Sequence, residues 1–176
     1  MAFGGAKKFY DEAGLYEYAV GALARRMRSV AELKRLLRRR VEKDELGAAL
    51  VELVIAKLKE QRYLNDAQYA STYSSLRREN DRYGRRRVVT ELKSRGVHSE
   101  VIEKAVAGIY DGVNEEALAR AYLRRKRLQK PADQKQAARV FRSLIRAGFG
   151  TRTIISILKK WDVDDEVLTA LESEES

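Results

Sequence analysis

Arginine and lysine side chains recur in this sequence at spacings that place them together on one side of a helix. At about 100° per residue, Arg139, Arg142 and Arg146 fall within roughly 60° of one another. They lie opposite the apolar residues Val140 and Leu144. A guanidinium binds phosphate and carboxylate groups through paired hydrogen bonds. The chemistry that this pattern predicts is therefore the binding of an anionic partner.

Two earlier stretches carry the same pattern. Basic side chains face away from Leu33 and Leu36 in the first stretch, and from Val88 and Leu92 in the second. Lysine and arginine also populate ordinary exposed helix faces, and for any single stretch that alternative is about as good. Three such stretches in one basic chain favour an anion-binding surface. The candidate binding residues are Lys34, Arg35, Arg38, Arg39, Arg77, Arg78, Arg82, Arg85, Arg86, Arg87, Lys93, Arg139, Arg142 and Arg146.

The side chains that catalysis commonly requires are scarce. The chain has no cysteine, so it has neither a thiolate nucleophile nor a cysteine-ligated metal, and it has one histidine, His98, next to a helix-ending glycine. Paired carboxylates such as Glu115 and Glu116 fall in the first turn of a helix, where they suit the helix dipole. No glycine-rich phosphate loop is present. We expect no enzymatic activity, no cofactor and no metal.

The charge is unevenly distributed along the chain. Seven of the 26 acidic residues and none of the 36 basic ones lie from Trp161 to Ser176, so residues 1–160 carry 36 positive against 19 negative side chains. The acidic end could compete with an anionic partner for the basic surface. Neither a signal peptide nor a membrane-spanning stretch is evident. We expect a cytoplasmic monomer.

Apolar residues at helical spacing predict an all-α fold. Nine helices fall into three groups of three, with a short acidic helix after them. A group of three such helices buries its apolar faces poorly alone, so we expect the groups to stack into an elongated, curved array. The predicted organisation is a loose segment at 1–12, helical repeats at 13–62, 63–112 and 113–161, and an acidic segment at 162–176.

An alignment of the ends of the three middle helices supports this repeat. Gly96 and Gly148 coincide, whereas Arg40 takes their place in the first copy, so we expect that turn to close differently. The same alignment brings basic residues of the different copies together, Arg38 with Arg146 and Lys34 with Arg142. The apolar columns are Leu33, Leu36, Val41 and Leu46, then Val89, Leu92, Val97 and Ile102, then Phe141, Leu144, Phe149 and Ile154.

Short polar residues at the expected helix starts predict the helix caps. The helix at about 43–61 is apolar almost all round, so we expect it to be buried. Tyr69 and Tyr73 lie on an apolar stripe, which favours packing in the core over stacking on nucleobases. The predicted caps are a Ser29–Glu32 capping box, Asp66, Ser99, an Asp133–Gln136 capping box and Thr151.

A group of residues in the central stretch from Tyr63 to Val97 forms a recognisable motif. These residues are Tyr63-Leu64-Asn65-Asp66, Tyr69-Ala70, Tyr73, Gly84, Glu91-Leu92 and Gly96. Through them the stretch resembles the RecX family, the regulatory proteins of the bacterial recombinase RecA. The three tandem three-helix repeats are also similar to that family. One departure is Arg85, where the family commonly has proline, a residue that presets the first-turn angle of a helix.

The resemblance implies a non-enzymatic modulator, most simply a negative regulator. Members of the family bind along the groove of the RecA–DNA filament and restrain ATP hydrolysis and strand exchange. The implied partners are the RecA filament and single- or double-stranded DNA. Charge alone supports a second hypothesis, a general nucleic-acid-binding helical repeat without a recombinase partner.

Overall fold

The computed structural model describes residues 9–173, which form ten α-helices, one π-helical turn and no strand. The predicted all-α class is confirmed. Residues 1–8 of the expected loose segment and 174–176 of the acidic segment lie outside the described residues. The helices are α1 (Glu12–Arg25), α2 (Val30–Leu37), α3 (Glu45–Glu60), α4 (Asp66–Leu76), a π-helical turn (Arg77–Asp81), α5 (Arg85–Ser94), α6 (Ser99–Tyr110), α7 (Glu115–Arg125), α8 (Gln134–Arg146), α9 (Thr151–Lys159) and α10 (Asp165–Ser173).

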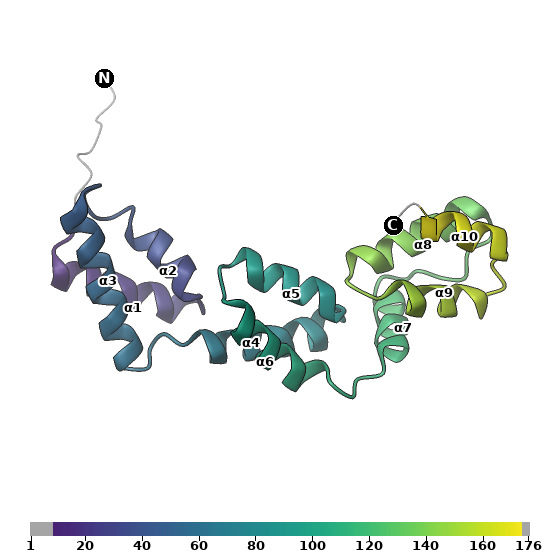
Figure 1. Cartoon of the computed structure of the whole chain (residues 1–176), viewed down its shortest axis with the longest axis horizontal. Coiled ribbons are helices and arrows are strands. Elements are labelled where there is room, and N and C mark those ends of the chain that lie inside the picture. The colour runs from purple at the N-terminus through teal and green to yellow at the C-terminus, as the bar shows by residue number, and fades with distance from the viewer. Residues whose placement is uncertain (1–8, 174–176) are drawn as a thin grey trace, which may run out of the picture.

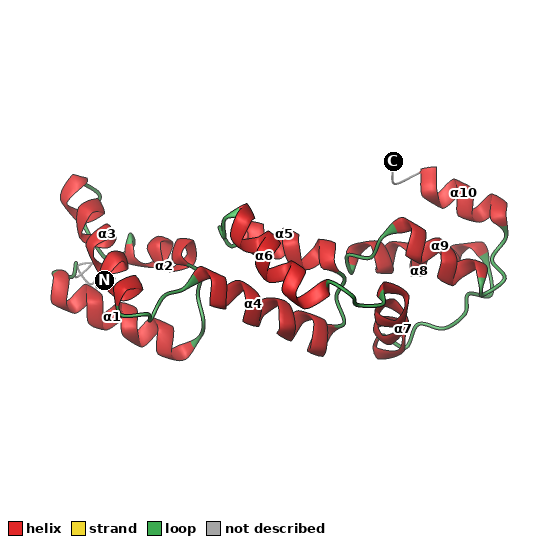
Figure 2. Cartoon of the chain, turned by 60° about the horizontal axis from the view of Figure 1, so that its bottom comes forward, coloured by secondary structure: helices red, strands yellow, loops and turns green. Residues whose placement is uncertain are grey.

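The helices form three groups in a row, so the molecule is an elongated rod (Figure 1). The groups are α1–α3, α4–α6 and α7–α10, and the view in Figure 2 shows the same succession from another side. The middle helices α2, α5 and α8 lie along the upper side of Figure 1, and the helices that pack against them lie mainly below. Three equivalent helices are thus presented along one side of the rod.

Two hydrophobic cores hold the rod together, and their division does not follow the three groups. The first group has a core of its own, which includes Leu15, Leu33 and Leu58. The second and third groups share one core that runs from Tyr69 to Leu171. Burial of apolar surface is the main stabilising term in folding. We therefore expect the second and third groups to unfold together, and the first group to be the more independent.

Several helix starts follow the sequence closely. Ser29 and Glu32 form the predicted capping box at α2, in which each side chain accepts the other's backbone N–H at 3.1 Å. Asp133 caps α8 by accepting the backbone N–H of Gln136 at 2.7 Å, which is half of the predicted capping box. The Gln136 side chain accepts the Ala132 N–H at 3.2 Å and not the N–H of Asp133. These caps join residues three apart, so they depend only on local geometry.

Three predicted caps are wrong. Asn65, not Asp66, caps α4, because its side chain accepts the N–H groups at both the second and third positions of the helix. The N-cap positions of α6 and α9 belong to His98 and Gly150, and neither has a side-chain cap. Ser99 and Thr151 are instead the first residues of those helices.

The start of α9 is capped by a side chain from another helix. The carboxylate of Glu115, in the first turn of α7, accepts the Gly150 N–H at 3.0 Å and a hydrogen bond from the hydroxyl of Thr153. Glu115 therefore has a tertiary role in addition to the expected favourable position near the α7 dipole.

The C-terminal turns of the middle helices differ as expected. Gly96 and Gly148 take left-handed angles, with φ of 77° and 90°, and close α5 and α8 in the same way. After α2 the turn closes without a left-handed residue, through a bond from the Arg40 N–H to the Leu37 carbonyl at 2.8 Å. Val41 follows Leu37 by four residues, whereas Val97 and Phe149 follow Leu92 and Leu144 by five. Leu33 and Leu37 are fully buried on α2 as Val88 and Leu92 are on α5, so the alignment of α2 shifts by one residue, which pairs Arg35 with Arg142 and Arg39 with Arg146.

The third helix is not buried on all sides as expected. Val51, Val54 and Leu58 face the first core, but Leu46 is 78% exposed and Leu53 is 51% exposed. The physical reason is the length of the row. Helix α3 lies at its end and packs mainly against α1 and α2, and no further group of helices within residues 9–173 covers its outer side.

Candidate binding surface

The middle helices of the second and third groups meet end to end. The Gly84 N–H, at the start of α5, donates to the Ala147 carbonyl at the end of α8 over 2.8 Å. The Arg86 N–H donates to the Gly148 carbonyl over 3.3 Å. These bonds satisfy N–H and carbonyl groups that helix ends normally leave unpaired, and they align the two helix dipoles head to tail.

The middle helices of the first and second groups meet in the same way. The Ser29 hydroxyl, at the start of α2, donates to the Arg95 carbonyl at the end of α5 over 2.6 Å. Ser29 and Gly84 are both N-cap residues, and Arg95 and Ala147 both precede a left-handed glycine. The helices α8, α5 and α2 therefore follow one another along one side of the rod.

Asp66 belongs to the same junction. Although it does not cap its own helix, its carboxylate accepts the Val30 N–H at the start of α2 over 2.8 Å. Glu32 adds a second link, because it accepts hydrogen bonds from Arg95 at 2.7 Å and from the Tyr69 hydroxyl at 3.3 Å. The first group is thus joined to the second by polar contacts rather than by a shared core.

The predicted binding residues divide into two sets. Ten of the fourteen are exposed, and Lys34, Arg77, Arg78 and Arg87 are half-buried. Within residues 9–173, seven form no ion pair and so present charge to solvent: Arg35, Arg39, Arg82, Arg86, Lys93, Arg139 and Arg146. Arg142 is also exposed. We name these eight residues the basic edge.

The guanidinium groups of Arg77 and Arg87 are bound to other side chains of the second group. Their Nε atoms pair with the two oxygens of Glu91, at 3.2 and 3.0 Å. The Tyr73 hydroxyl donates to the same carboxylate at 2.6 Å, and Arg87 lies 3.9 Å above the ring of Tyr83. Burial, followed by the hydrogen bond to Glu91, raises the pKa of Tyr73. This cluster fixes α4 against α5 and leaves the two guanidinium groups little capacity for a partner.

Three further candidates, Lys34, Arg38 and Arg85, are paired more loosely. Lys34 lies 2.6 Å from Glu52, and Arg38 lies 3.9 Å from the same residue. Arg85 pairs with Asp111 at 3.1 Å. Exposed ion pairs such as these contribute about 0–1 kcal/mol, so a phosphate could displace them at little cost. Arg78 is held more firmly, because it also donates to the Ile109 carbonyl at 2.6 Å.

Tyr69 and Tyr73 pack into the protein, as expected, and so does Tyr83. Tyr69 is buried, and its ring stacks on Tyr73 at 5.9 Å between centroids. Tyr83 contributes to the same core and contacts Tyr122 of the third group. None of the three offers a free ring face to a nucleobase.

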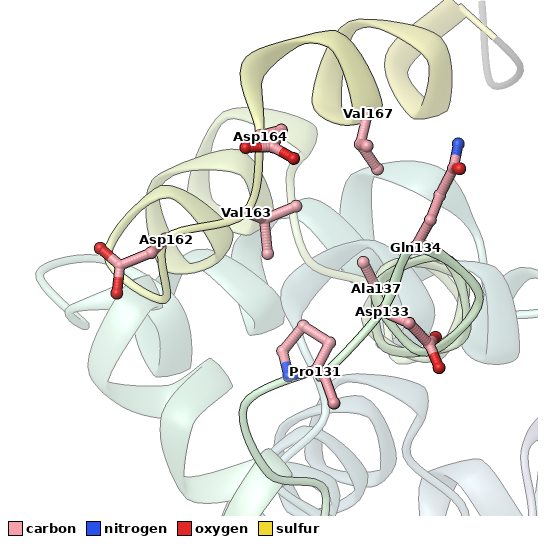
Figure 3. Close-up of a pocket in the computed structure, with 9 residues that line it drawn as sticks. Pro131, Asp133, Gln134, Ala137, Asp162, Val163, Asp164 and Val167 are labelled. Atoms are coloured by element: carbon pink, nitrogen blue, oxygen red, sulfur yellow. The ribbon is translucent and has the colours of Figure 1, made fainter.

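The acidic end of the chain is part of the third group. Helix α10 packs against α8 and α9 and buries Leu168 and Leu171, while Asp165 pairs with Lys159 at 3.0 Å. A shallow pocket of about 220 Å³ lies between the loop before α8 and the start of α10 (Figure 3). Asp133 and Asp162 line it and point away from each other. Because acidic side chains line this pocket, it does not suit a phosphate ligand.

Neither a metal-binding cluster nor a membrane-spanning helix is found among the described residues. No group of three or more His, Cys, Asp and Glu side chains in this part of the chain is arranged to bind a metal ion. No helix between residues 9 and 173 has the length and apolar character needed to cross a bilayer.

Some basic and aromatic residues near the junction of the first and second groups were not predicted as binding residues from the sequence. Arg26 and Arg28 line a pocket with Arg35 and Arg39. Tyr63 is 59% exposed, although it belongs to the central motif. The signal available in the sequence is the basic run immediately before the Ser29 capping box, which lies outside any helix and so cannot be found by considering helical faces.

Known proteins resemble this chain in sequence. The family model described as "RecX, second three-helix domain" matches residues 65–106, which cover most of α4–α6. The Regulatory protein RecX of Pseudomonas putida is 34% identical over 148 residues, covering 84% of this chain and 90% of that protein. The chain belongs to the RecX family. The RecX proteins of Mycolicibacterium vanbaalenii and Bacillus pumilus are 35% and 30% identical over 126 and 146 residues, covering 70% and 82% of this chain.

Two solved RecX structures share the fold. A crystal structure of regulatory protein RecX aligns with a TM-score of 0.66 at 22% identity, over 85% of this chain and 73% of that one. RecX from Lactobacillus salivarius aligns with a TM-score of 0.64 at 19% identity, over 86% and 96%. The chain spans 66% of the Mycolicibacterium RecX protein and 54% of the Bacillus one, so RecX proteins differ considerably in length.

Proposed function

We propose that this RecX-family chain modulates the RecA recombinase by binding along the RecA–DNA filament through the basic edge. The observation that carries the proposal is the end-to-end succession of α8, α5 and α2, which puts exposed, unpaired cations on three consecutive helices. The name Regulatory protein RecX, borne by the relatives, supports the recombinase as the partner.

The shape of the rod suits a filament. A filament presents the same acidic groups repeatedly, whether they belong to DNA phosphates or to protein carboxylates. Once one group of helices is bound, the others bind as effectively intramolecular partners, and the affinity rises without any new type of contact. Each arginine on the edge can make a paired hydrogen bond to phosphate or carboxylate.

The proposed effect is restraint of ATP hydrolysis and strand exchange. A rod bound across several protomers has its strongest affinity for one arrangement of them. It therefore opposes any change in that arrangement by the difference between its affinities for the two states. No side chain of this chain has to take part in the hydrolysis.

The test is RecA-catalysed ATP hydrolysis and strand exchange on single-stranded DNA, with the chain added at rising concentration. We expect both rates to fall, and we expect the double variant Arg86→Glu with Arg139→Glu to require at least tenfold more protein for the same effect. Arg152→Glu, a charge reversal at an exposed position on α9 that forms no ion pair within residues 9–173, is the matched control. Unchanged rates at saturating protein would reject the proposal.

Co-sedimentation with preformed filaments separates the proposal from general nucleic-acid binding. A RecA modulator binds the filament more tightly than naked DNA at roughly physiological salt. Equal affinity for the two, with a steep dependence on salt for both, would favour a nucleic-acid-binding protein without a recombinase partner.

A further inference from the structure

A groove of about 100 Å³ lies where the first and second groups meet. Its walls come from the end of α1, from the loop before α2 and from the segment between α3 and α4. Its lining includes Met27, Arg28, Arg62 and Tyr63.

Tyr63 has no structural task that explains its place in this groove. Its three neighbours in the central motif each have one: Leu64 is buried, Asn65 caps α4 and Asp66 accepts the start of α2. Tyr63 is 59% exposed, and its hydroxyl makes no hydrogen bond within residues 9–173. An exposed aromatic ring beside a groove is the feature on which a nucleobase stacks.

The backbone next to this tyrosine carries a strained arginine. Arg62 has a φ of 62°, in the left-handed region that favours glycine at a helix end. The corresponding position after α6 is occupied by Gly112, with a φ of 77°. An arginine in this region costs about 1 kcal/mol more than glycine. The side chain of Arg62 forms no ion pair in the described part of the chain, while the turn itself is closed by bonds from the Arg62 N–H to the Lys59 carbonyl at 3.0 Å and from the Tyr63 N–H to the Leu58 carbonyl at 2.9 Å. Arg82, Arg127 and Asp162 also have a positive φ, so the angle alone marks no binding site.

A second, basic pocket adjoins the groove. It has a volume of about 250 Å³ and contains Arg26, Arg28, Arg35 and Arg39, so Arg28 lines both hollows and the second one reaches the basic edge. The carboxylate in this pocket, Glu32, accepts hydrogen bonds from the Ser29 N–H and from Arg95, and it also lies 3.8 Å from Arg26 in an ion pair. The remaining charge of the pocket is positive.

We propose that the groove and the adjoining pocket form a subsite for single-stranded nucleic acid. One base stacks on Tyr63 beside the exposed thioether of Met27, and the neighbouring phosphates bind Arg28 and the arginines of the pocket. A duplex does not fit this arrangement, because its bases are stacked inside the helix. The inference rests on the proposed DNA contact and deepens it, since it assigns the single strand to one end of the rod.

The experiment is fluorescence anisotropy with three labelled ligands of equal length: oligothymidine, the same backbone with abasic sites throughout, and a duplex. We expect Tyr63→Ala to weaken oligothymidine binding about 5-fold to 150-fold, which corresponds to the loss of one stacked base. We expect Tyr63→Ala to change the affinity for the abasic strand and for the duplex by less than about twofold relative to the unchanged chain. Tyr63→Phe keeps the ring and binds oligothymidine as the unchanged chain does.

A control variant and two contrary outcomes test whether the effect belongs to this groove. Leu46→Ala removes an apolar side chain that is also exposed but lies on α3, away from the groove, and we expect it to have no effect. An equal loss on all three ligands, or no loss on oligothymidine, would overturn the subsite. If Tyr63→Ala weakened binding of an acidic peptide instead, the groove would be a protein-binding site and the inference would be wrong. We expect Tyr63→Ala to restrain RecA as the unchanged chain does, whereas the double variant Arg86→Glu with Arg139→Glu loses that restraint. The two results together distinguish a failure of the subsite from a failure of the proposed function.

Discussion

The carbonyl oxygen of Gly148 lies 2.3 Å from the position that a Cβ atom on Gly84 would occupy. No real side chain tolerates such an approach, so the contact between α5 and α8 requires glycine at that position. The same contact brings the Arg87 backbone nitrogen within 2.3 Å of a Cβ built on Gly148. The two glycines set how closely the second and third groups approach.

We therefore expect Gly84→Ala to separate the ends of α5 and α8. The loss should be about 1–3 kcal/mol in the free energy of unfolding, as for other overpacked sites. Urea unfolding followed by circular dichroism measures it. Gly108→Ala is the matched control, because nothing lies within 4 Å of its Cβ and it is in the interior of α6, where alanine adds about 0.5–1 kcal/mol. Equal stability of the two variants would contradict the close approach.

Arg95→Ala should loosen the first group specifically. Arg95 donates to Glu32 at 2.7 Å and lies 4.8 Å from the ring centre of Tyr73. A hydrogen bond between charged groups contributes about 1.5–3 kcal/mol. Since the first group has a separate core, we expect faster amide hydrogen exchange in α1–α3 and unchanged exchange in α7–α9. Arg25→Ala, which loses only a bond within its own helix, serves for comparison. A uniform rise in exchange along the chain would refute the division of the cores.

Acid should loosen the third group through Glu116. Its hydrogen bonds with Lys160 and with Arg120 lower the pKa of Glu116 from its usual 4.5 to about 2. Since the folded pKa is the lower one, the stabilisation is fully present above about pH 4.5 and is lost as the pH falls through about 2. We expect Glu116→Gln to reduce stability at pH 7, and the difference from the unchanged chain to vanish near pH 2.

A carbon-detected titration of the Glu116 carboxyl group gives the pKa directly. Glu100→Gln, at an exposed position on α6 that forms no ion pair in the described part of the chain, should leave the pH profile of unfolding as it is. A Glu116 midpoint near 4.5 would show that the ion pairs do not persist in solution.

Neighbouring arginines on α5 should behave in opposite ways. Arg87 pairs with Glu91, lies over Tyr83 and donates to the Arg146 carbonyl at 3.1 Å, so Arg87→Ala should cost about 1–3 kcal/mol of stability. Arg86→Ala should change stability by less than about 0.5 kcal/mol. It should, however, weaken DNA binding and lower the salt slope by about one. Equal effects of the two variants on stability would contradict the assignment of Arg87 to the fold.

Local features of this chain were predictable because they depend on residues that are close in sequence. Apolar spacing placed the helices, and residues three apart identified the Ser29 capping box. The glycine pair Gly96 and Gly148 marked equivalent turns, since only glycine takes a left-handed conformation without cost. The same reasoning failed at Asp66, where the carboxylate serves the next group rather than its own helix.

The sequence by itself determined the all-α class, the repeated three-helix pattern and the strongly basic composition, because each follows from a short period or from a count. Only the tertiary structure decided which cations remain available. Arg77 meets Glu91 because α4 and α5 pack against each other within the second group. Arg95 meets Glu32, 63 residues away, because the first and second groups stack in one register. The division of the cores and the groove beside Tyr63 have the same origin, since both form where distant segments come into contact.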